Sequence, residues 1–183
     1  SAPYVELAGV YRKMGYLRRA VSDYQKGAAI EPTGTAYLGM AESYVDEGDM
    51  TAATAALEEA RPLLPKADYN VSLGEILHRT GDMAKAAAAW EAAIQADSSR
   101  DDIRLKLAVV YNAMGRRTQA DHLLRDMESR YPESPLVHFL RAWVLYDEGQ
   151  RAAALAHARK VEQLEPTDLV EHYNAMLMSR LKQ

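Results

Sequence analysis

The sequence predicts an all-α protein built from stacked helical hairpins, and three regularities carry this prediction. Five glycines recur at spacings of 33, 33, 34 and 34 residues, namely Gly15, Gly48, Gly81, Gly115 and Gly149. The residue seven positions before each glycine is small, and the residue five positions after it is alanine each time. A proline stands seventeen positions after four of the five glycines. A fixed period of this length is typical of a repeat architecture.

Each period is interpreted as two helices joined by a tight turn. Glycine ends the first helix cheaply because it adopts the left-handed conformation of a helix C-terminus. The proline ends the second helix because it has no backbone N–H to continue the hydrogen-bond pattern. The small residues allow close approach of the two backbones. One such hairpin cannot bury its own apolar face, whereas a stack of hairpins can.

This interpretation gives the boundaries of each element in order. First helices are expected at about 3–14, 35–47, 67–80, 101–114 and 135–148, and second helices at about 17–30, 50–63, 83–96, 117–130 and 151–164. Ser134 followed by Pro135 is a typical helix start. Where the other repeats have the closing proline, the third has Ser98, and Ser98 and Ser99 are expected to cap the next helix. An eleventh helix begins after Thr167 or Asp168 and runs to about 181; its polar outer face, with Glu171, Asn174 and Lys182 but also Met178, would close the stack.

These residues resemble the tetratricopeptide repeat (TPR) family over residues 2 to 166. In the first repeat the resemblance is carried by Tyr4, Leu7, Ala8, Tyr11, Gly15, Ala20, Tyr24, Gly27 and Pro32. The resemblance implies a right-handed α-solenoid, forming a single domain over 1–183, with repeats at about 1–33, 34–66, 67–100, 101–134 and 135–167 and a capping helix at 168–182. It also implies that the first helices line a concave groove in which ligands bind. Arg141 departs from the pattern, since the other repeats have an aliphatic residue there.

Composition excludes several classes of function. The net charge is −4 and the sequence pI is about 5.7, which argues against binding to nucleic acid or to an anionic membrane surface. Charge and period also disfavour RNA-binding pentatricopeptide repeats. No apolar run approaches the length of a membrane-spanning helix, so direct membrane insertion is not expected. Cysteine is absent, which leaves the compartment open between cytoplasm and periplasm.

The candidate groove follows from counting back from each glycine. Positions ten, six and three before the glycines, with their counterparts in the last helix, give the predicted site: Val5, Arg12, Leu38, Glu42, Val71, Glu75, His78, Leu105, Val109, Asn112, Phe139, Trp143, Tyr146, Tyr173 and Leu177. Phe139, Trp143 and Tyr146 form one stripe on a helix. Either they pack against the neighbouring first helix, or they form an apolar floor for a partner. The N-terminal half of the groove is charged, and Val5 and Gly9 stand where the family's carboxylate-clamping repeats use lysine and asparagine, which disfavours that mode.

No pattern of catalytic or metal-binding residues emerges, so neither an enzyme, nor a cofactor, nor a metal site is expected. The sequence has no HExxH motif and no histidine pair at i, i+4 with a nearby carboxylate. His138 and His172 hold equivalent places in successive first helices and are expected near each other. Trp90 stands where the repeat needs bulk, and is expected in the core.

The sequence therefore predicts an adaptor that binds a peptide or helix of a partner protein in the groove. The many alanines and the absence of cysteine favour a bacterial origin. The resemblance to the family then implies an assembly or scaffolding factor. The alternative is a structural scaffold whose groove mediates self-association as a homo-oligomer, or packs against an adjoining segment of a longer chain.

Overall fold

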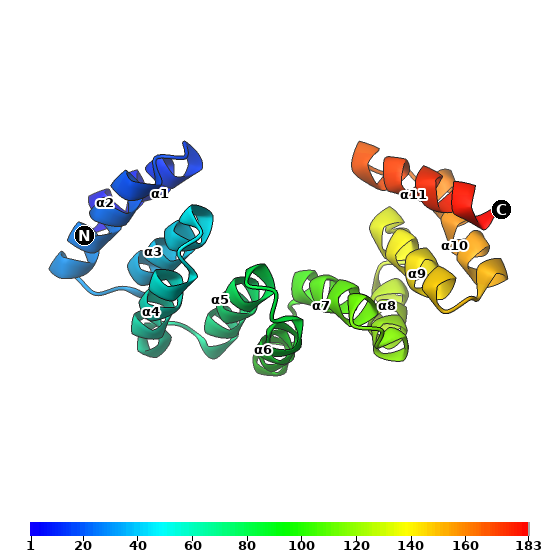
Figure 1. Ribbon diagram of the computed structural model, residues 1–183, viewed down its shortest axis with the longest axis horizontal. Coiled ribbons are helices and arrows are strands. Elements are labelled where there is room, and N and C mark those ends of the chain that lie inside the picture. The colour runs from blue at the N-terminus through cyan, green and yellow to red at the C-terminus, as the bar shows by residue number, and fades with distance from the viewer. Residues whose placement is uncertain (183) are drawn as a thin grey trace. The chain divides into compact units, whose positions relative to one another are not determined.

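The computed structural model describes residues 1–182, and within them every regular element is helical (Figure 1). The chain forms two compact units, Ser1–Ser98 and Ser99–Gln183. The prediction that the whole chain is one domain stays a prediction. Among the helices of residues 1–182, none combines the length and apolarity needed to cross a membrane.

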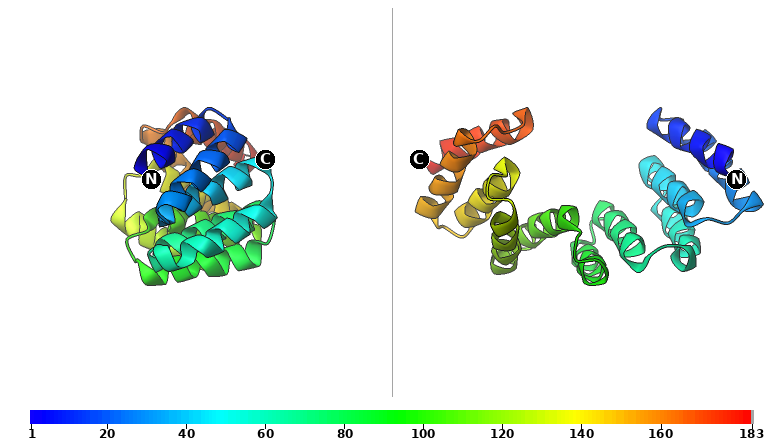
Figure 2. Two further views of the ribbon diagram at one scale, coloured as in Figure 1. Left: turned by 90° about the vertical axis from the view of Figure 1, so that its left-hand side faces the viewer. Right: turned by 180° about the vertical axis from the view of Figure 1, so that it is seen from behind.

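The first unit consists of three helical hairpins. Its helices are α1 (Ala2–Lys13), α2 (Leu17–Ile30), α3 (Gly34–Glu47), α4 (Met50–Ala60), α5 (Lys66–Arg79) and α6 (Met83–Ala96), with the short 3-10 helix η1 (Arg61–Leu63) after α4. Each helix packs against its partner in the hairpin, and the first helices α1, α3 and α5 contact one another in order (Figure 2).

The second unit consists of two hairpins and a final helix. Its helices are α7 (Asp101–Ala113), α8 (Arg117–Arg130), α9 (Pro135–Asp147), α10 (Arg151–Gln163) and α11 (Asp168–Leu181). Helix α8 packs on α9, and α11 packs on both α9 and α10, so that α11 closes this end of the unit. The observed boundaries agree with the predicted helices to within one residue, except at the C-terminal end of α4.

The turn glycines adopt the conformation for which the repeat selects them. The φ angles of Gly15, Gly48, Gly81, Gly115 and Gly149 lie between 74° and 86°. This left-handed region is costly for residues that carry a Cβ atom.

The small residues at the two fixed offsets are buried between the helices of each hairpin. The five alanines after the glycines are fully buried (Ala20, Ala53, Ala86, Ala120 and Ala154). In the third repeat Gly74 replaces alanine, and a Cβ atom there would lie 2.3 Å from Nε1 of Trp90. Trp90 is 1% exposed, which confirms that it belongs to the core, and its Nε1 donates to the carbonyl oxygen of Val71 at 3.3 Å.

Two local predictions at helix ends are wrong. Helix α4 ends at Ala60 instead of continuing to residue 63, because Pro62 lacks the N–H that an α-helix needs, and the chain finishes with a 3-10 turn. The N-cap residue of α7 is Arg100 rather than Ser98 or Ser99. At α9 the expected start is confirmed, since the Ser134 side chain accepts a hydrogen bond from the Val137 N–H.

The prediction that Asn174 belongs to a polar outer face of α11 is wrong. Asn174 is 2% exposed, and its Nδ2 donates to the Ala158 carbonyl oxygen at 2.9 Å. Met178 is also buried, in a cluster with Ala142, Leu145 and Leu177. A polar side chain thus serves as a core residue here, because the Ala158 carbonyl oxygen of α10 accepts its hydrogen bond.

Candidate functional site

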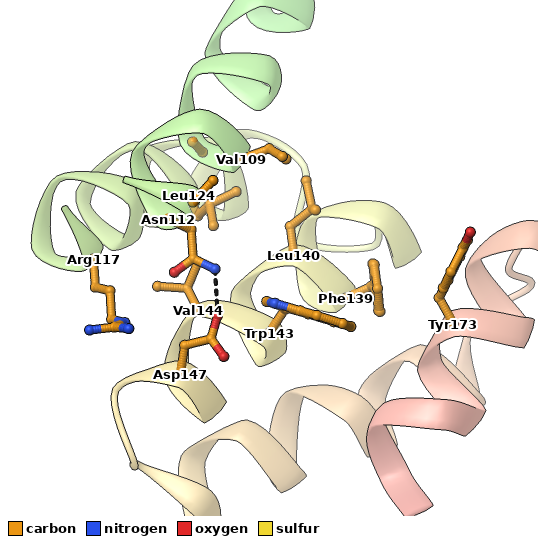
Figure 3. Close-up of a pocket in the computed structure, with 12 residues that line it drawn as sticks. Val109, Asn112, Arg117, Leu124, Phe139, Leu140, Trp143, Val144, Asp147 and Tyr173 are labelled. Atoms are coloured by element: carbon orange, nitrogen blue, oxygen red, sulfur yellow. Dashed lines mark hydrogen bonds between the residues drawn. The ribbon is translucent and has the colours of Figure 1, made fainter. Parts of the chain in front are cut away.

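A pocket of about 580 Å³ opens on the second unit (Figure 3). Helices α7, α8, α9 and α11 each contribute to its lining. The lining residues are mostly apolar: Ala108, Val109, Asn112, Ala113, Arg117, Leu124, Phe139, Leu140, Trp143, Val144, Asp147 and Tyr173. We call this cavity the aromatic pocket.

Three half-exposed rings form one side of the aromatic pocket. The Phe139 ring packs edge-on against Trp143, with centroids 6.0 Å apart, and it lies 6.4 Å from the ring of Tyr173 (Figure 3). The Arg180 guanidinium lies 5.8 Å from the centroid of the Trp143 ring. Tyr173 is 43% exposed, and Val109 on α7 is 48% exposed. The rings are therefore ordered by contacts with one another while part of their surface remains accessible.

A polar pair crosses the aromatic pocket from α7 to α9. The Asn112 Nδ2 donates to Oδ2 of Asp147 at 2.7 Å, as the dashed line in Figure 3 marks. Because a carboxylate only accepts hydrogen bonds, this contact fixes the orientation of the Asn112 amide. The Asn112 Oδ1 is buried and has no hydrogen-bond partner within residues 1–182. An acceptor of this kind is costly to leave unpaired, and a ligand N–H would satisfy it.

A second pocket, of about 320 Å³, lies on the first unit and is charged. We call it the charged pocket. It is lined by Arg12, Leu38, Ala41, Glu42, Val45, Asp46, Val71, Ser72, Glu75, Ile76 and Arg79. Arg12 pairs with Glu42 at 2.8 Å and with Asp46 at 3.2 Å, and Arg79 pairs with Asp46 at 3.1 Å. The charges that line this pocket are thus largely engaged with one another.

The pKa values of Arg12 and Glu42 in the charged pocket are shifted by burial and by nearby charges, including each other's. Partial burial alone would lower the pKa of Arg12, but Glu42 and Asp46 raise it above its ordinary value. Partial burial raises the pKa of Glu42, although Arg12 opposes the shift.

The predicted groove residues divide into three groups. Val109, Asn112, Phe139, Trp143 and Tyr173 line the aromatic pocket, and Arg12, Leu38, Glu42, Val71 and Glu75 line the charged pocket. The remaining five line neither of the two: Val5, His78, Leu105, Tyr146 and Leu177.

Local packing explains four of these five positions. Leu177 is fully buried in the core, so a ligand has no access to it. Tyr146 packs against the same cluster. The His78 ring lies 5.6 Å from the ring of Trp90, and Val5 packs toward Gly27, where the missing side chain leaves room for it.

Counting positions on first helices missed part of each pocket lining. Asp147 follows Trp143 by four residues and so lies on the same face of the helix. Extending the count by one helical turn beyond Trp143 would have included it. Arg117 and Leu124 come from the second helix α8, which the count left out.

Hairpins of two helices, repeated with glycine turns and small residues between them, define a helical-repeat protein. Four models of the tetratricopeptide repeat match the sequence, at residues 2–33, 38–101, 77–144 and 135–160. The chain belongs to the tetratricopeptide repeat family, whose fold serves in general as an adaptor for protein interactions. Among curated proteins, none matches the sequence significantly.

Solved TPR structures share the fold at low sequence identity. The structure of pilF from Pseudomonas aeruginosa superposes with a TM-score of 0.79 at 19% identity, covering 98% of this chain and 82% of that one. A structure of MamA gives 0.74 at 21% identity, covering 88% and 90%. YrrB, described as a TPR protein with an unusual peptide-binding site, gives 0.73 at 18% identity, covering 95% and 91%.

Proposed function

We propose that this protein is an adaptor that binds a peptide segment or helix of a partner protein in the aromatic pocket of its second unit. The observation that carries the proposal is the combination of accessible rings with an unpaired, buried hydrogen-bond acceptor in one cavity. Membership of the TPR family supports a protein as the partner.

The apolar lining supports an anchoring side chain as the main source of affinity. Phe139, Trp143 and Val109 offer the surface against which a large apolar side chain of the ligand would pack. Burying one such side chain contributes roughly 1.5–3 kcal/mol. Two or three of them would give affinities on the order of micromolar, after the cost of association is subtracted.

The polar groups of the pocket favour a peptide over a purely apolar ligand. The Oδ1 of Asn112 would accept a hydrogen bond from a backbone N–H or a side-chain amide of the ligand. The guanidinium of Arg117 is exposed at the α8 side of the lining, where a carboxylate of the ligand would meet it. We therefore expect a ligand with an apolar anchor and a nearby acidic residue.

The proposal includes a role as a bacterial assembly or scaffolding factor. The alanine-rich and cysteine-free composition supports a bacterial origin, and membership of the TPR family supports a scaffolding role. The alternative is a scaffold in which a second copy of the chain, or an adjoining segment, fills the pocket. The exposed apolar surface at Val109 and Tyr173 would serve self-association equally well.

A peptide library displayed on phage, selected against the intact chain, tests the adaptor function. The variant Val109→Glu introduces a charge at the rim of the aromatic pocket. Val10→Glu is its matched control, because Val10 is also an exposed valine of a first helix, at 51% exposure against 48%, but lines neither described pocket. We expect selected peptides to bind the intact chain and Val10→Glu, and to lose at least tenfold in affinity for Val109→Glu. Equal affinity for both variants would remove the aromatic pocket as the binding site.

Sedimentation velocity over a range of concentrations separates the adaptor from the self-associating scaffold. A mass that stays that of one chain supports the adaptor. A mass that rises with concentration, and no longer rises in Trp143→Ala, supports self-association through the aromatic pocket.

A further inference from the structure

Three side chains from three helices of the second unit converge away from the aromatic pocket. Glu128 of α8, His138 of α9 and His157 of α10 bring one ligand atom each within 4.8 Å of one another. The two Nδ1 atoms of the histidines are 3.1 Å apart, and the Glu128 Oε1 lies 3.7 Å from Nδ1 of His138 and 4.0 Å from Nδ1 of His157. Within residues 1–182, the imidazole that contacts His138 is thus His157, in the second helix of the same repeat.

The backbone orients His138 so that its Nδ1 faces this cluster as a hydrogen-bond acceptor. Its Nε2 lies 2.8 Å from the carbonyl oxygen of Pro132, and a carbonyl only accepts hydrogen bonds. The proton of neutral His138 is therefore on Nε2, and Nδ1 is left as an acceptor. An imidazole that donates one N–H to a carbonyl while the other nitrogen is free is the usual arrangement of a metal-binding histidine. The His138 side chain is 5% exposed, so few alternative orientations are open to it.

His157 places a second imidazole beside His138. The two rings stack, with centroids 5.4 Å apart and an angle of 29° between their planes. Burial lowers the pKa of His157 and Arg141 lowers it further, whereas Glu128 opposes the shift. Without an ion, Nδ1–H of His157 donates to Nδ1 of His138. A metal ion would require only that this proton move to Nε2 of His157, since the ring remains neutral.

The third side chain, Glu128, is held by its other oxygen. Arg141 donates to Oε2 of Glu128 and also to Oδ1 of Asp121 at 3.2 Å. Oε1 of Glu128 is thereby directed to the histidines. The departure of Arg141 from the repeat pattern thus has a structural role, because it joins α9 to two carboxylates of α8.

The charges around the cluster select the class of ion. Asp121 and Glu128 are balanced by Arg141 and by Arg125, which pairs with Asp121 at 2.7 Å. A hard cation such as Ca²⁺ or Mg²⁺, which depends on oxygen ligands and negative charge, finds little attraction here. An ion that binds imidazole strongly is favoured. Two nitrogens bound tetrahedrally to zinc at about 2.0–2.1 Å would lie roughly 3.3–3.4 Å apart, close to the spacing of this pair.

We propose that Glu128, His138 and His157 form a binding site for one Zn²⁺ ion, with the fourth position open to water. A carboxylate with two imidazoles is a ligand set that zinc uses in proteins. The site departs from the expectation, drawn from the sequence, that the chain binds no metal. It is independent of peptide binding, because none of the three ligands lines the aromatic pocket. Bound zinc would link α8, α9 and α10, and would stabilise the second unit by binding only the folded chain.

To test this proposal, the full chain without a purification tag is first treated with a chelator, and its binding of Zn²⁺ is then measured. Competition against a chromophoric zinc chelator measures stoichiometry and affinity, and calorimetry measures the unfolding temperature with and without Zn²⁺. We expect one Zn²⁺ per chain and a higher unfolding temperature in its presence. His157→Asn and Glu128→Gln keep the approximate size of each side chain, and we expect each to weaken binding at least tenfold.

Two exposed histidines provide the control. His122 and His172 belong to the same unit but not to the cluster, and the double variant His122→Ala/His172→Ala should bind zinc as the intact chain does. Failure of the intact chain to bind Zn²⁺ saturably would overturn the proposal, as would unchanged binding by His157→Asn. Peptide binding at the aromatic pocket is measured separately, so failure of one proposal leaves the other standing.

Discussion

Replacing Gly74 by alanine should destabilise the protein, and the same change should stabilise it once Trp90 is reduced to leucine. A Cβ atom at Gly74 would lie 2.3 Å from Nε1, 2.4 Å from Cδ1 and 2.9 Å from Cε2 of Trp90, far inside normal contact distance. The indole cannot easily withdraw, because it is buried and hydrogen-bonded to Val71. Overpacking of this kind costs about 1–3 kcal/mol, against a gain of about 1 kcal/mol from alanine in a helix. We expect a net loss of about 1 kcal/mol, and at most about 2 kcal/mol.

Trp90→Leu alone removes the clash partner and leaves a cavity, at a cost of roughly 2–4 kcal/mol. In that background Gly74→Ala fills space and regains about 1 kcal/mol of helix propensity. The double variant reproduces the pairs already present in the second and fourth repeats, Ala41 with Leu57 and Ala108 with Leu124. The effect of one substitution should therefore change sign with the residue that faces it, which corresponds to a coupling of about 2 kcal/mol.

Urea unfolding followed by circular dichroism measures this cycle without depending on tryptophan fluorescence. Gly9→Ala is the control, since a Cβ atom there would meet only the Tyr24 hydroxyl, at an ordinary 3.5 Å. It should stabilise the chain by up to about 1 kcal/mol. If Gly74→Ala has the same effect with Trp90 and with Leu at position 90, close packing of the glycine on the indole is not what positions these helices.

Three further predictions concern single polar contacts. Asn174→Ala removes a buried hydrogen bond to α10 and should lower the free energy of unfolding by about 1–3 kcal/mol, as measured by thermal unfolding. The control Glu171→Ala, on the exposed face of α11, should change it by less than about 0.5 kcal/mol. Equal effects of the two substitutions would contradict the core role of Asn174. Burial and the hydrogen bond to Glu58 raise the pKa of Tyr69 to about 12, so an absorbance titration should show a tyrosine that ionises near pH 12 and is missing in Tyr69→Phe. Because this folded pKa lies above the value of about 10 for unfolded tyrosine, the contact contributes stability below about pH 10, which is lost as pH rises toward 12. Arg12→Ala should change the free energy of unfolding by only about 0–1 kcal/mol, because its ion pairs are solvent-accessible; a larger loss in urea titration would show that the charged pocket holds the first unit together.

The repeat period predicted the helices well because each boundary depends on local chemistry. Glycine turns, Ser134 before Pro135 and the alanine positions act within a few residues of where they stand. The end of α4 was missed although the signal was present, since Pro62 lies inside the predicted helix. The burial of Asn174 could not be read from residue type, because it depends on a carbonyl oxygen supplied by another helix.

The candidate site was predicted only in part, because some of its features depend on contacts between helices. Register alone placed Phe139 and Trp143 on an accessible face, but it could not show that Val5 finds room over Gly27 or that Leu177 is enclosed. The pairing of His138 with His157 was missed because the comparison was made only among first helices. Contacts between the two helices of one hairpin depend on their relative rotation, which periodicity does not report.

The hydrogen bond from Asn112 to Asp147 joins helices of two successive repeats across a single cavity. The proposed recognition by the aromatic pocket would therefore belong to neither repeat alone. Exchange of one whole repeat by recombination would renew one part of the proposed binding surface and retain the rest. New specificities would thus arise from new combinations of adjacent repeats, whereas each repeat contributes its own share to the stability of the stack.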